Sequence, residues 1–295
     1  MKIALIAKPI AGRKGVEDQI ASVEKKLRIR NIHCDIFKTA YHAHAIELAK
    51  NLDLKEYDAV VAMGGDGTNY HVLNGLIKYH PDEELPPLGV IPVGRGNSFA
   101  RDLQIESLQD GVNAVVGQKT TTVDVCRFTQ GPESFYFVNL MGFGFVTDAA
   151  KTAARFSRTG DFSYVIGVLH RTLWLTFHSM ELKIDGIEYG GPNCFVEFCN
   201  SRYTGGDMLM APDAHISDGY FDVVILSPLS RWSLLTTFPK IFKGTHAENP
   251  AVRFIKAKSA TVRTDPPKIL LPDGEIFGTT PTQIEIEPGR VRYFT

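Results

Sequence analysis

The sequence lacks the features that mark several specialised classes of protein. None of its apolar stretches is long enough to span a bilayer. Residues 1–8 form too short an apolar run for a signal peptide and instead predict a first strand. The four cysteines show no Cys-x-x-Cys spacing and no zinc motif is present, which indicates buried, reduced thiols. These absences predict a cytoplasmic protein.

An excess of charge of one sign is lacking as well. The 32 basic and 33 acidic residues leave a net charge of −1, which gives no reason to expect a nucleic-acid partner. The 44% hydrophobic and 22% charged content is that of an ordinary globular protein, without internal repeats. At 295 residues the chain is long enough for two domains, each with a core of its own.

Strand-like and helix-like segments alternate through the first part of the chain. This alternation favours a doubly wound α/β domain, in which helices cover both faces of a parallel sheet. Ligands bind beyond the carboxyl ends of such strands, and the loops after residues 7, 62 and 93 all contain glycine. The expected strands are 2–7, 32–37, 57–62 and 88–93, and the expected helices are 15–30, 42–51, a segment ending near 79, and 98–103.

From about residue 120 the pattern changes to short strands separated by Gly, Pro and Asp turns. Such a run predicts a β-sandwich or a partly open barrel. We therefore expect domains 1–122 and 123–295, and leave open whether the last strand returns to the first domain. The expected strands are 123–128, 135–141, 180–185, 193–199, 220–226, 252–257, 260–264, 282–287 and 290–294, with a helix over 161–177.

A glycine-rich turn follows the third expected strand and precedes a helical pattern. Gly64, Gly65 and Gly67 allow positive φ and close backbone approach, which suits a turn packed against phosphate. A helix starting after Thr68 would direct N–H groups and a positive dipole end at the same space. Asp66 can there hold Mg²⁺ or accept a proton. The alternative, a strand–helix turn with Asp66 as an N-cap, stays open on this turn alone.

Two further glycine loops offer positive charge. In the loop over 9–15, Lys14 is the best-placed phosphate contact, although a solvated basic turn explains the same residues. This loop is not a Walker P-loop, because it has no Gly-Lys-Ser/Thr ending. After residue 93, Arg95 can neutralise phosphate. Asn97 or Ser98 is expected to cap the following helix, which does not exclude ligand contact.

Acidic pairs stand in two loops of the second half. Asp213 and Asp218 can hold a hard cation together with backbone carbonyls, and Asx-type turns are the competing explanation. Asp273 and Glu275 flank a glycine after an apolar run. They form either a hairpin turn or an acid pair available for Mg²⁺ binding or base catalysis.

The order of these motifs resembles that of the diacylglycerol kinase catalytic-domain family, which includes soluble bacterial diacylglycerol kinases, sphingosine kinases and ceramide kinases. The later Gly-Gly-x-Met, Ala-Pro and Asp-Gly-Glu motifs are more specific than the glycine turn, which NAD kinases and phosphofructokinases share. The matching residues run nearly end to end: Pro9, Gly12, 64–68, 72–76, 88–94, 97–101, Asp124, 142–144, 205–206, Met208, 211–212, 218–219 and 273–275.

The resemblance implies an ATP-binding domain of the NAD kinase and phosphofructokinase type, followed by a β-rich lipid-substrate domain. ATP and Mg²⁺ are the implied cofactors. Asp66 and Asp273 are the implied candidates for base or Mg²⁺ organiser, with Glu275 in support. The implied ligands of a structural Mg²⁺ loop are Asp213, Asp218 and the carbonyl of Ile216. The implied nucleotide contacts are Pro9, Gly12, Lys14, Thr39, Gly64, Gly65, Gly67, Thr68, Gly94, Arg95, Gly96 and Asn97.

On this resemblance the chain is an ATP-dependent lipid kinase that phosphorylates a hydroxyl of diacylglycerol or of a related lipid such as a sphingoid base. An NAD kinase-like enzyme and a catalytically silent nucleotide- or lipid-binding relative stay open as alternatives. Departures from the family pattern leave the lipid open, and these are Lys8, Tyr70, His71, Arg95 and Ser98.

The implied partner is a membrane-derived lipid, with peripheral contact at the inner membrane surface and a homodimer as further expectations. Two segments, around Trp174 and over 231–243, mix aromatic, apolar and basic residues as interfacial segments do. Core-facing helices are the preferred interpretation of both segments from sequence alone.

Overall fold

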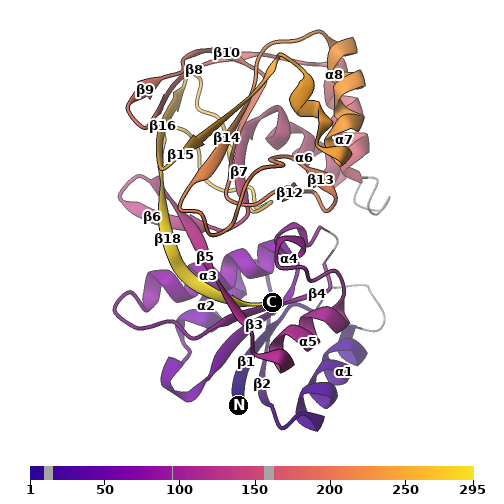
Figure 1. The fold of residues 1–295 in the computed structure, drawn as a ribbon, viewed down its shortest axis with the longest axis vertical. Coiled ribbons are helices and arrows are strands. Elements are labelled where there is room, and N and C mark those ends of the chain that lie inside the picture. Colours follow the sequence, from indigo (N-terminus) through magenta and orange to yellow (C-terminus); the bar gives the residue numbers. More distant parts are fainter. Residues whose placement is uncertain (10–15, 95, 156–162) are drawn as a thin grey trace. The chain divides into compact units, whose positions relative to one another are not determined.

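The chain divides into two compact units. Unit 1 contains residues 1–123 and 289–295, and unit 2 contains residues 124–288 (Figure 1). The computed structural model describes residues 1–9, 16–94, 96–155 and 163–295. The functional assignment of 1–122 to ATP and of 123–295 to the lipid stays a prediction.

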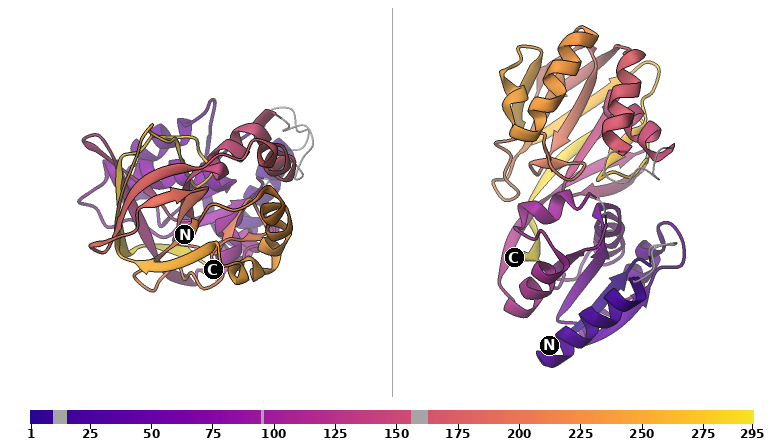
Figure 2. Two further views of the ribbon diagram at one scale, coloured as in Figure 1. Left: turned by 90° about the horizontal axis from the view of Figure 1, so that it is seen from above. Right: turned by 90° about the vertical axis from the view of Figure 1, so that its right-hand side faces the viewer.

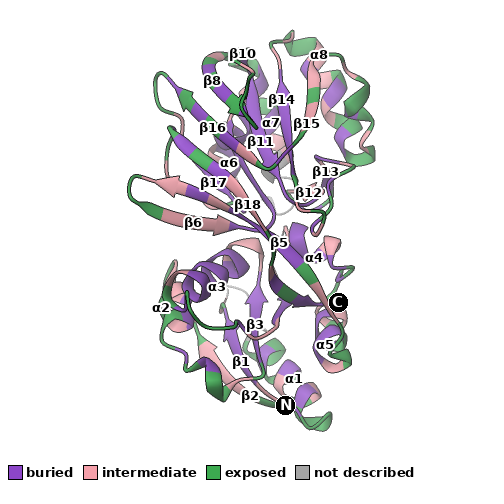
Figure 3. Cartoon of the chain, turned by 60° about the vertical axis from the view of Figure 1, so that its left-hand side comes forward, coloured by how far each residue is buried: buried purple, intermediate pink, exposed green. Residues whose placement is uncertain are grey.

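Unit 1 is built on a parallel sheet of short, apolar strands. These are β1 (Lys2–Ala7), β2 (His33–Lys38), β3 (Ala59–Gly64), β4 (Leu88–Pro92) and the end of β18 (Thr282–Phe294). Their order is β18-β4-β3-β1-β2, and Tyr293 of β18 pairs in parallel with Leu88. Strands β3 and β4 are buried along their whole length, as expected for a sheet covered on both faces, and Figure 3 shows β3 in the colour of buried residues.

Helices cover both faces of this sheet, as the alternating pattern predicted. They are α1 (Val16–Ile29), α2 (His44–Lys50), η1 (Leu54–Glu56), α3 (Asp66–Tyr79), α4 (Ser98–Asp102) and α5 (Leu108–Gly117). Helices α2 and α3 pack together, and α1 packs with α5 on the other side (Figure 1). Helix α5 begins at a capping box in which Ser107 and Asp110 each accept the other's backbone N–H.

Unit 2 is β-sandwich-like and contains two main sheets. The antiparallel five-stranded sheet has the order β15 (Val252–Ala257), β14 (Phe221–Leu226), β11 (Phe195–Cys199), β7 (Leu140–Gly144) and β17 (Leu270–Pro272). The second contains β10 (Gly191–Asn193), β8 (His178–Ile184), β16 (Ser259–Thr264), β18, β5 (Thr120–Gln130), β6 (Glu133–Phe137) and β9 (Ile187–Glu188). A small hairpin joins β12 (Tyr203–Thr204) to β13 (Met208–Leu209).

Helices cover one face of the five-stranded sheet (Figure 2). They are α6 (Phe145–Arg155), α7 (Ser163–Leu173), α8 (Arg231–Thr237), η3 (Phe238–Lys243) and η4 (Thr245–Glu248). The apolar core between them joins Phe195 and Val224 of the sheet to Val168 of α7 and Leu234 of α8. Burial of these side chains is the main stabilising term for this half of unit 2.

Three expectations about secondary structure are wrong in detail. The segment 135–141 forms two strands, β6 and β7, because the N–H groups of Val138 and Asn139 donate to the Asp273 carboxylate and leave the ladder. The strands expected at 282–287 and 290–294 are one continuous strand, β18. Helices α5 and α6 and strand β17 are not among the expected elements.

Candidate active site

The loops after β3 and β4 meet through their glycines. A Cβ on Gly94 would lie 2.6 Å from the Cα of Gly65, and a Cβ on Gly64 would lie 2.2 Å from Oγ1 of Thr68. The Gly94 N–H also donates to the Gly64 carbonyl at 3.2 Å. Since no side chain larger than hydrogen fits these contacts, the two predicted phosphate loops form one continuous backbone surface.

Asp66 holds this surface together. Its carboxylate accepts the N–H groups of Ser98 and Phe99 at 2.9 and 3.1 Å, at the start of α4, and also bonds the Ser98 hydroxyl. Asp66 therefore caps a helix, but this helix is α4 and not the helix to which Asp66 itself belongs. The bonds tie the glycine turn to the helix that follows the second loop.

The expectation that Asn97 or Ser98 caps α4 is wrong. Asn97 stands at the N-cap position with φ 47°, and it makes no side-chain capping bond. Its Nδ2 donates to the Gly94 carbonyl at 2.9 Å instead. Because Asp66 already occupies the free N–H groups of the helix, the Asn97 side chain is used to close its own loop.

The surroundings of Asp66 oppose its ionisation. Burial raises the pKa of its carboxyl, and the N–H groups of Ser98 and Phe99 offset part of this effect. Asp66 lies in the first turn of the 14-residue helix α3, where the positive dipole end favours negative charge. A carboxylate with a raised pKa is a stronger base, so Asp66 suits proton transfer as well as helix capping.

Two buried oxygen atoms beside the glycine loops have no hydrogen-bond partner among the described residues. They are Oγ1 of Thr68 and Oδ1 of Asn97. A buried polar atom without a partner is costly, which points to a ligand or ion as the missing partner. Oxygen atoms of this kind are ligands that Mg²⁺ accepts, and they lie next to the N-terminal end of α3, where phosphate binds readily.

The remaining predicted nucleotide contacts fall into two groups. Pro9 follows β1 and Thr39 follows β2, so both lie at the same carboxyl edge as the glycine loops; the Thr39 N–H donates to the Ala7 carbonyl at 2.9 Å. Gly67 lies in the first turn of α3 and Gly96 in the loop after β4, and both are partly buried. The predicted contacts outside the described residues are Gly12, Lys14 and Arg95.

In unit 2, Asp273 has a clear structural role. It is 2% exposed, and its two oxygens accept the N–H groups of Val138, Asn139 and Leu140 at 3.0–3.2 Å. These bonds hold the connection between β6 and β7. Glu275, two residues further on, is partly exposed, and its N–H closes a turn onto the Pro272 carbonyl at 2.8 Å.

The predicted metal loop already contains a protein cation that was missed from sequence. Lys256 Nζ lies 2.7 Å from Oδ2 of Asp218 and 3.5 Å from the buried Asp222. Asp213 is exposed, and the Ile216 carbonyl accepts the Asp124 N–H at 2.7 Å. Lys256 is 38 residues from Asp218, so no local spacing reveals it. The Mg²⁺ loop stays a prediction.

Asp124 is a second residue that lacked an assigned role. It is buried, and its Oδ2 accepts the Gly219 N–H at 2.6 Å. The Asn200 amide donates to its carbonyl at 2.9 Å. Asp124 therefore fixes the end of the 213–219 loop against the core of unit 2.

Comparison with known proteins identifies the family. The family model described as the diacylglycerol kinase catalytic domain matches residues 2–128, and the YegS C-terminal NAD kinase beta sandwich-like domain matches residues 139–295. The chain belongs to the diacylglycerol kinase catalytic-domain family. The expected fold class, a parallel-sheet domain followed by a β-sandwich-like domain, is confirmed.

Relatives in this family are distant but match over most of their length. A diacylglycerol kinase from Bacillus subtilis is 28% identical, covering 94% of this chain and 90% of that protein. Sphingosine kinase 1 from Arabidopsis thaliana is 25% identical, covering 94% and 68%. A solved Bacillus anthracis chain assigned as a diacylglycerol kinase overlays with a TM-score of 0.82 at 24% identity, covering 99% and 96%, which supports the fold.

As a member of this family, the chain is an ATP-dependent lipid kinase. It is therefore a phosphotransferase that uses an alcohol group as acceptor. ATP is the phosphate donor that the family implies. Within the described residues, no helix combines the length and the apolar character needed to cross a membrane.

Proposed function

We propose that this lipid kinase transfers the γ-phosphate of Mg²⁺-ATP to a hydroxyl of diacylglycerol or of a sphingoid base. The names of the Bacillus subtilis and Arabidopsis relatives support these two lipid classes. The observation that carries the proposal is the glycine surface of unit 1. There Asp66 joins the two loops, beside buried oxygen atoms that have no hydrogen-bond partner among the residues described.

The nucleotide phosphates bind over Gly64–Thr68 and Gly94–Asn97, with Lys14 and Arg95 as the proposed neutralising cations. Pro9, Gly12 and Thr39 complete the nucleotide contacts. Bound Mg²⁺ would neutralise phosphate charge, and Thr68 and Asn97 offer oxygen ligands for it. Catalysis on this surface is largely positioning and charge stabilisation, since phosphoryl transfer needs little covalent help from the protein.

The lipid hydroxyl oxygen forms a bond to the γ-phosphorus, the bond to the bridging oxygen breaks, and ADP leaves. The hydroxyl proton passes to a carboxylate, for which Asp66 and Glu275 are the candidates. Asp273 supports them indirectly, because its oxygens are engaged by three backbone N–H groups. We assign Asp273 the role of fixing the loop that carries Glu275.

A short part of the acceptor's hydrocarbon chain binds in an apolar cavity of unit 2, which has a volume of about 50 Å³. This cavity lies between the five-stranded sheet and the helices that cover it, within the core described above. Eleven of its fourteen lining residues are apolar, which matches a segment of an acyl or alkyl chain better than a polar substrate. Its lining includes Phe145, Val146, Val168, Phe195, Met208 and Leu234.

Peripheral membrane contact is the proposed route to the lipid. The preference for core-facing helices around Trp174 and over 231–243 is wrong for several large side chains, because Trp174 is 56% and Trp232 74% exposed. Helices α7 and α8 pack together. Exposed apolar side chains lie on these two helices and on the segments that follow them. We define the interfacial patch as Leu173, Trp174, Phe177, Trp232 and Phe242. Arg231, Lys240 and Lys243 stand in the same segments and suit anionic headgroups. A homodimer stays a prediction.

The test is a transfer assay with γ-labelled ATP, Mg²⁺ and a mixed-micelle panel of diacylglycerol, monoacylglycerol, sphingosine, ceramide and phosphatidylglycerol. NAD⁺ is a separate acceptor. Asp66→Asn, Glu275→Gln and Asp273→Asn are compared with Glu188→Gln, a matched change on the exposed strand β9. The variant that removes the base should lower kcat by roughly 10²–10⁴. Asp66→Asn should also lower Tm, because it removes one of the two carboxylate acceptors that cap α4. Asp273→Asn should lower Tm, since it leaves a buried N–H without its carboxylate.

Label in one lipid, lost in Asp66→Asn or Glu275→Gln, would name both the substrate and the base. Full kcat in Asp66→Asn would remove Asp66 from proton transfer. Label in NADP⁺ alone would contradict the lipid proposal. Bound ATP without transfer to any acceptor would favour a catalytically silent relative.

A further inference from the structure

Glu197 is a carboxylic acid inside the apolar core of unit 2. It lies on β11 between Gly142 of β7 and Val224 of β14, and only 1% of its surface is exposed. Its Oε2 has no hydrogen-bond partner among the described residues. Burial raises the pKa of Glu197 to about 8, so the side chain holds a proton at neutral pH.

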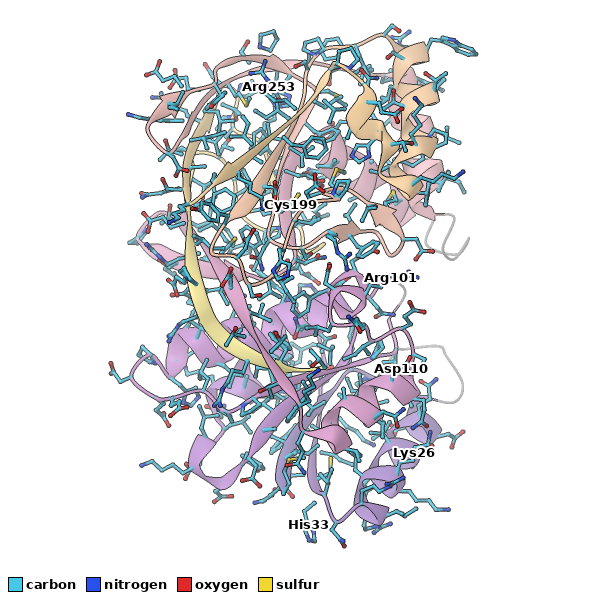
Figure 4. All side chains as sticks on the ribbon, viewed as in Figure 1. Lys26, His33, Arg101, Asp110, Cys199 and Arg253 are labelled. Atoms are coloured by element: carbon cyan, nitrogen blue, oxygen red, sulfur yellow. The ribbon has the colours of Figure 1, made fainter. Side chains whose placement is uncertain are left out.

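The side chain of Glu197 lies on the cavity side of the sheet. Alternation along β11 puts it on the same face as Phe195 and Cys199, which both belong to the core under the helices. The thiol of Cys199 is inside unit 2 in Figure 4. Phe195 also lines the apolar cavity.

Glu197 lies behind the cavity wall, and contacts at Gly142 bring it close to one of the lining residues. A Cβ on Gly142 would lie 2.7 Å from Cγ of Glu197 and 2.8 Å from Cγ2 of Val146. Val146 is itself a lining residue of the cavity. The missing side chain at residue 142 therefore makes room for the carboxyl next to the wall.

A buried polar atom without a partner costs roughly 1–3 kcal/mol, and an apolar residue of the same size would avoid this cost. Eleven of the fourteen residues that line the neighbouring cavity are apolar, and the three others are Thr204, Thr237 and His246. The neutral carboxyl can both donate and accept a hydrogen bond, which is the capacity that a hydroxyl group on a ligand matches.

We propose that Glu197 is a specificity-determining residue that selects a long-chain lipid carrying a hydroxyl on the part of its chain within the apolar cavity. This inference rests on the proposed function, because it takes the cavity as the site of the lipid chain. The hydroxyl that Glu197 binds is distinct from the hydroxyl that accepts the phosphate. The substrate class is therefore a hydroxylated long-chain alcohol, and not a lipid with plain hydrocarbon chains.

The test measures equilibrium binding of radiolabelled lipids in detergent micelles without ATP. Two pairs differ by chain hydroxyls: sphinganine with phytosphingosine, and dioleoylglycerol with diricinoleoylglycerol. The wild-type protein should bind the hydroxylated member of at least one pair about tenfold more tightly, the value of one good hydrogen bond. Glu197→Gln, which keeps hydrogen-bonding groups, should retain most of this preference. Glu197→Met, which is similar in size but apolar, should abolish it. Glu188→Gln should leave it unchanged.

Equal wild-type affinity within both pairs overturns the inference, as does an unchanged preference in a folded Glu197→Met protein. The wild-type comparison decides the matter even when a variant does not fold. Phosphoryl transfer is measured separately on the same lipids. A binding preference without transfer would contradict the proposed kinase activity and leave the role of Glu197 intact, so the two failures are distinguishable.

Discussion

At the scale of single residues, the buried acids divide by how their oxygens are satisfied. Asp273 and Asp66 each accept backbone N–H groups, so their positions are explained by the loops that they fix. Glu197 has no such partner for Oε2 within the part of the chain that the structure describes. Sequence could not separate these cases, because the N–H donors to Asp273 lie about 135 residues away along the chain.

The raised pKa of Glu197 makes the stability of unit 2 depend on pH. The carboxyl titrates near pH 8 in the folded state and near its ordinary 4.5 when unfolded. Its contribution is therefore complete below pH 4.5 and is lost as the pH rises toward 8, because the unfolded state binds fewer protons in that interval. The loss is on the order of 5 kcal/mol, at about 1.4 kcal/mol per pKa unit.

Glu197→Gln removes this titration. The free energy of unfolding of the variant should equal that of the wild type near pH 4.5. Between pH 4.5 and pH 8 it should exceed the wild-type value by a growing amount. Urea unfolding at a series of pH values, followed by tryptophan fluorescence, measures the difference. A constant difference across this range would contradict the assignment, and Glu188→Gln provides the exposed control.

At the scale of elements, periodicity predicted most of the unit 1 strands and helices to within a few residues. These elements alternate regularly and carry continuous apolar runs, so local pattern and tertiary packing agree. Helices α5 and α6 were missed although each carries an apolar face at helical spacing, with Val112 and Val115 buried in α5 and Val146, Ala149 and Ala153 buried in α6. Parallel-strand topology was enough to predict that the Gly65 and Gly94 loops lie at the same edge of the sheet. The hydrogen bonds that Asp66 accepts from α4 could be found only in the structure.

The exposed aromatic residues on α7 and α8 lead to a prediction at the same scale. We expect Trp174→Ser and Trp232→Ser each to weaken binding to anionic phosphatidylglycerol vesicles by about tenfold, since an indole withdrawn from water contributes roughly 1.5–3 kcal/mol. Vesicle co-sedimentation measures the effect. Tyr79→Ser, at an exposed aromatic residue of unit 1, is the matched control and should bind like the wild type. Wild-type protein that stays in the supernatant would contradict the membrane-contact proposal.

At the scale of the whole molecule, the chain order makes unit 1 depend on the last residues. Tyr293 is fully buried in unit 1, its hydroxyl donates to Oδ1 of Asn69 at 3.0 Å, and its ring packs edge-on against Phe99. The sequence pattern did not decide whether the last strand returns to the first domain. The partner residues Asn69 and Phe99 lie 224 and 194 positions earlier, and no local signal links them to Tyr293.

This arrangement predicts separable unfolding of the two units. Tyr293→Ala should cost unit 1 roughly 3–5 kcal/mol, as loss of a large buried ring usually does. Both tryptophans, Trp174 and Trp232, lie in unit 2, so fluorescence follows unit 2 while far-UV circular dichroism follows both units. In urea, part of the circular dichroism signal of the variant should be lost at a lower denaturant concentration than in the wild type. The midpoint of its fluorescence transition should equal that of the wild type. Phe198→Ala, at a fully buried ring of unit 2, should shift the fluorescence transition instead. Coincident shifts of both signals in Tyr293→Ala would mean that the two units unfold as one cooperative body, in spite of their separate cores.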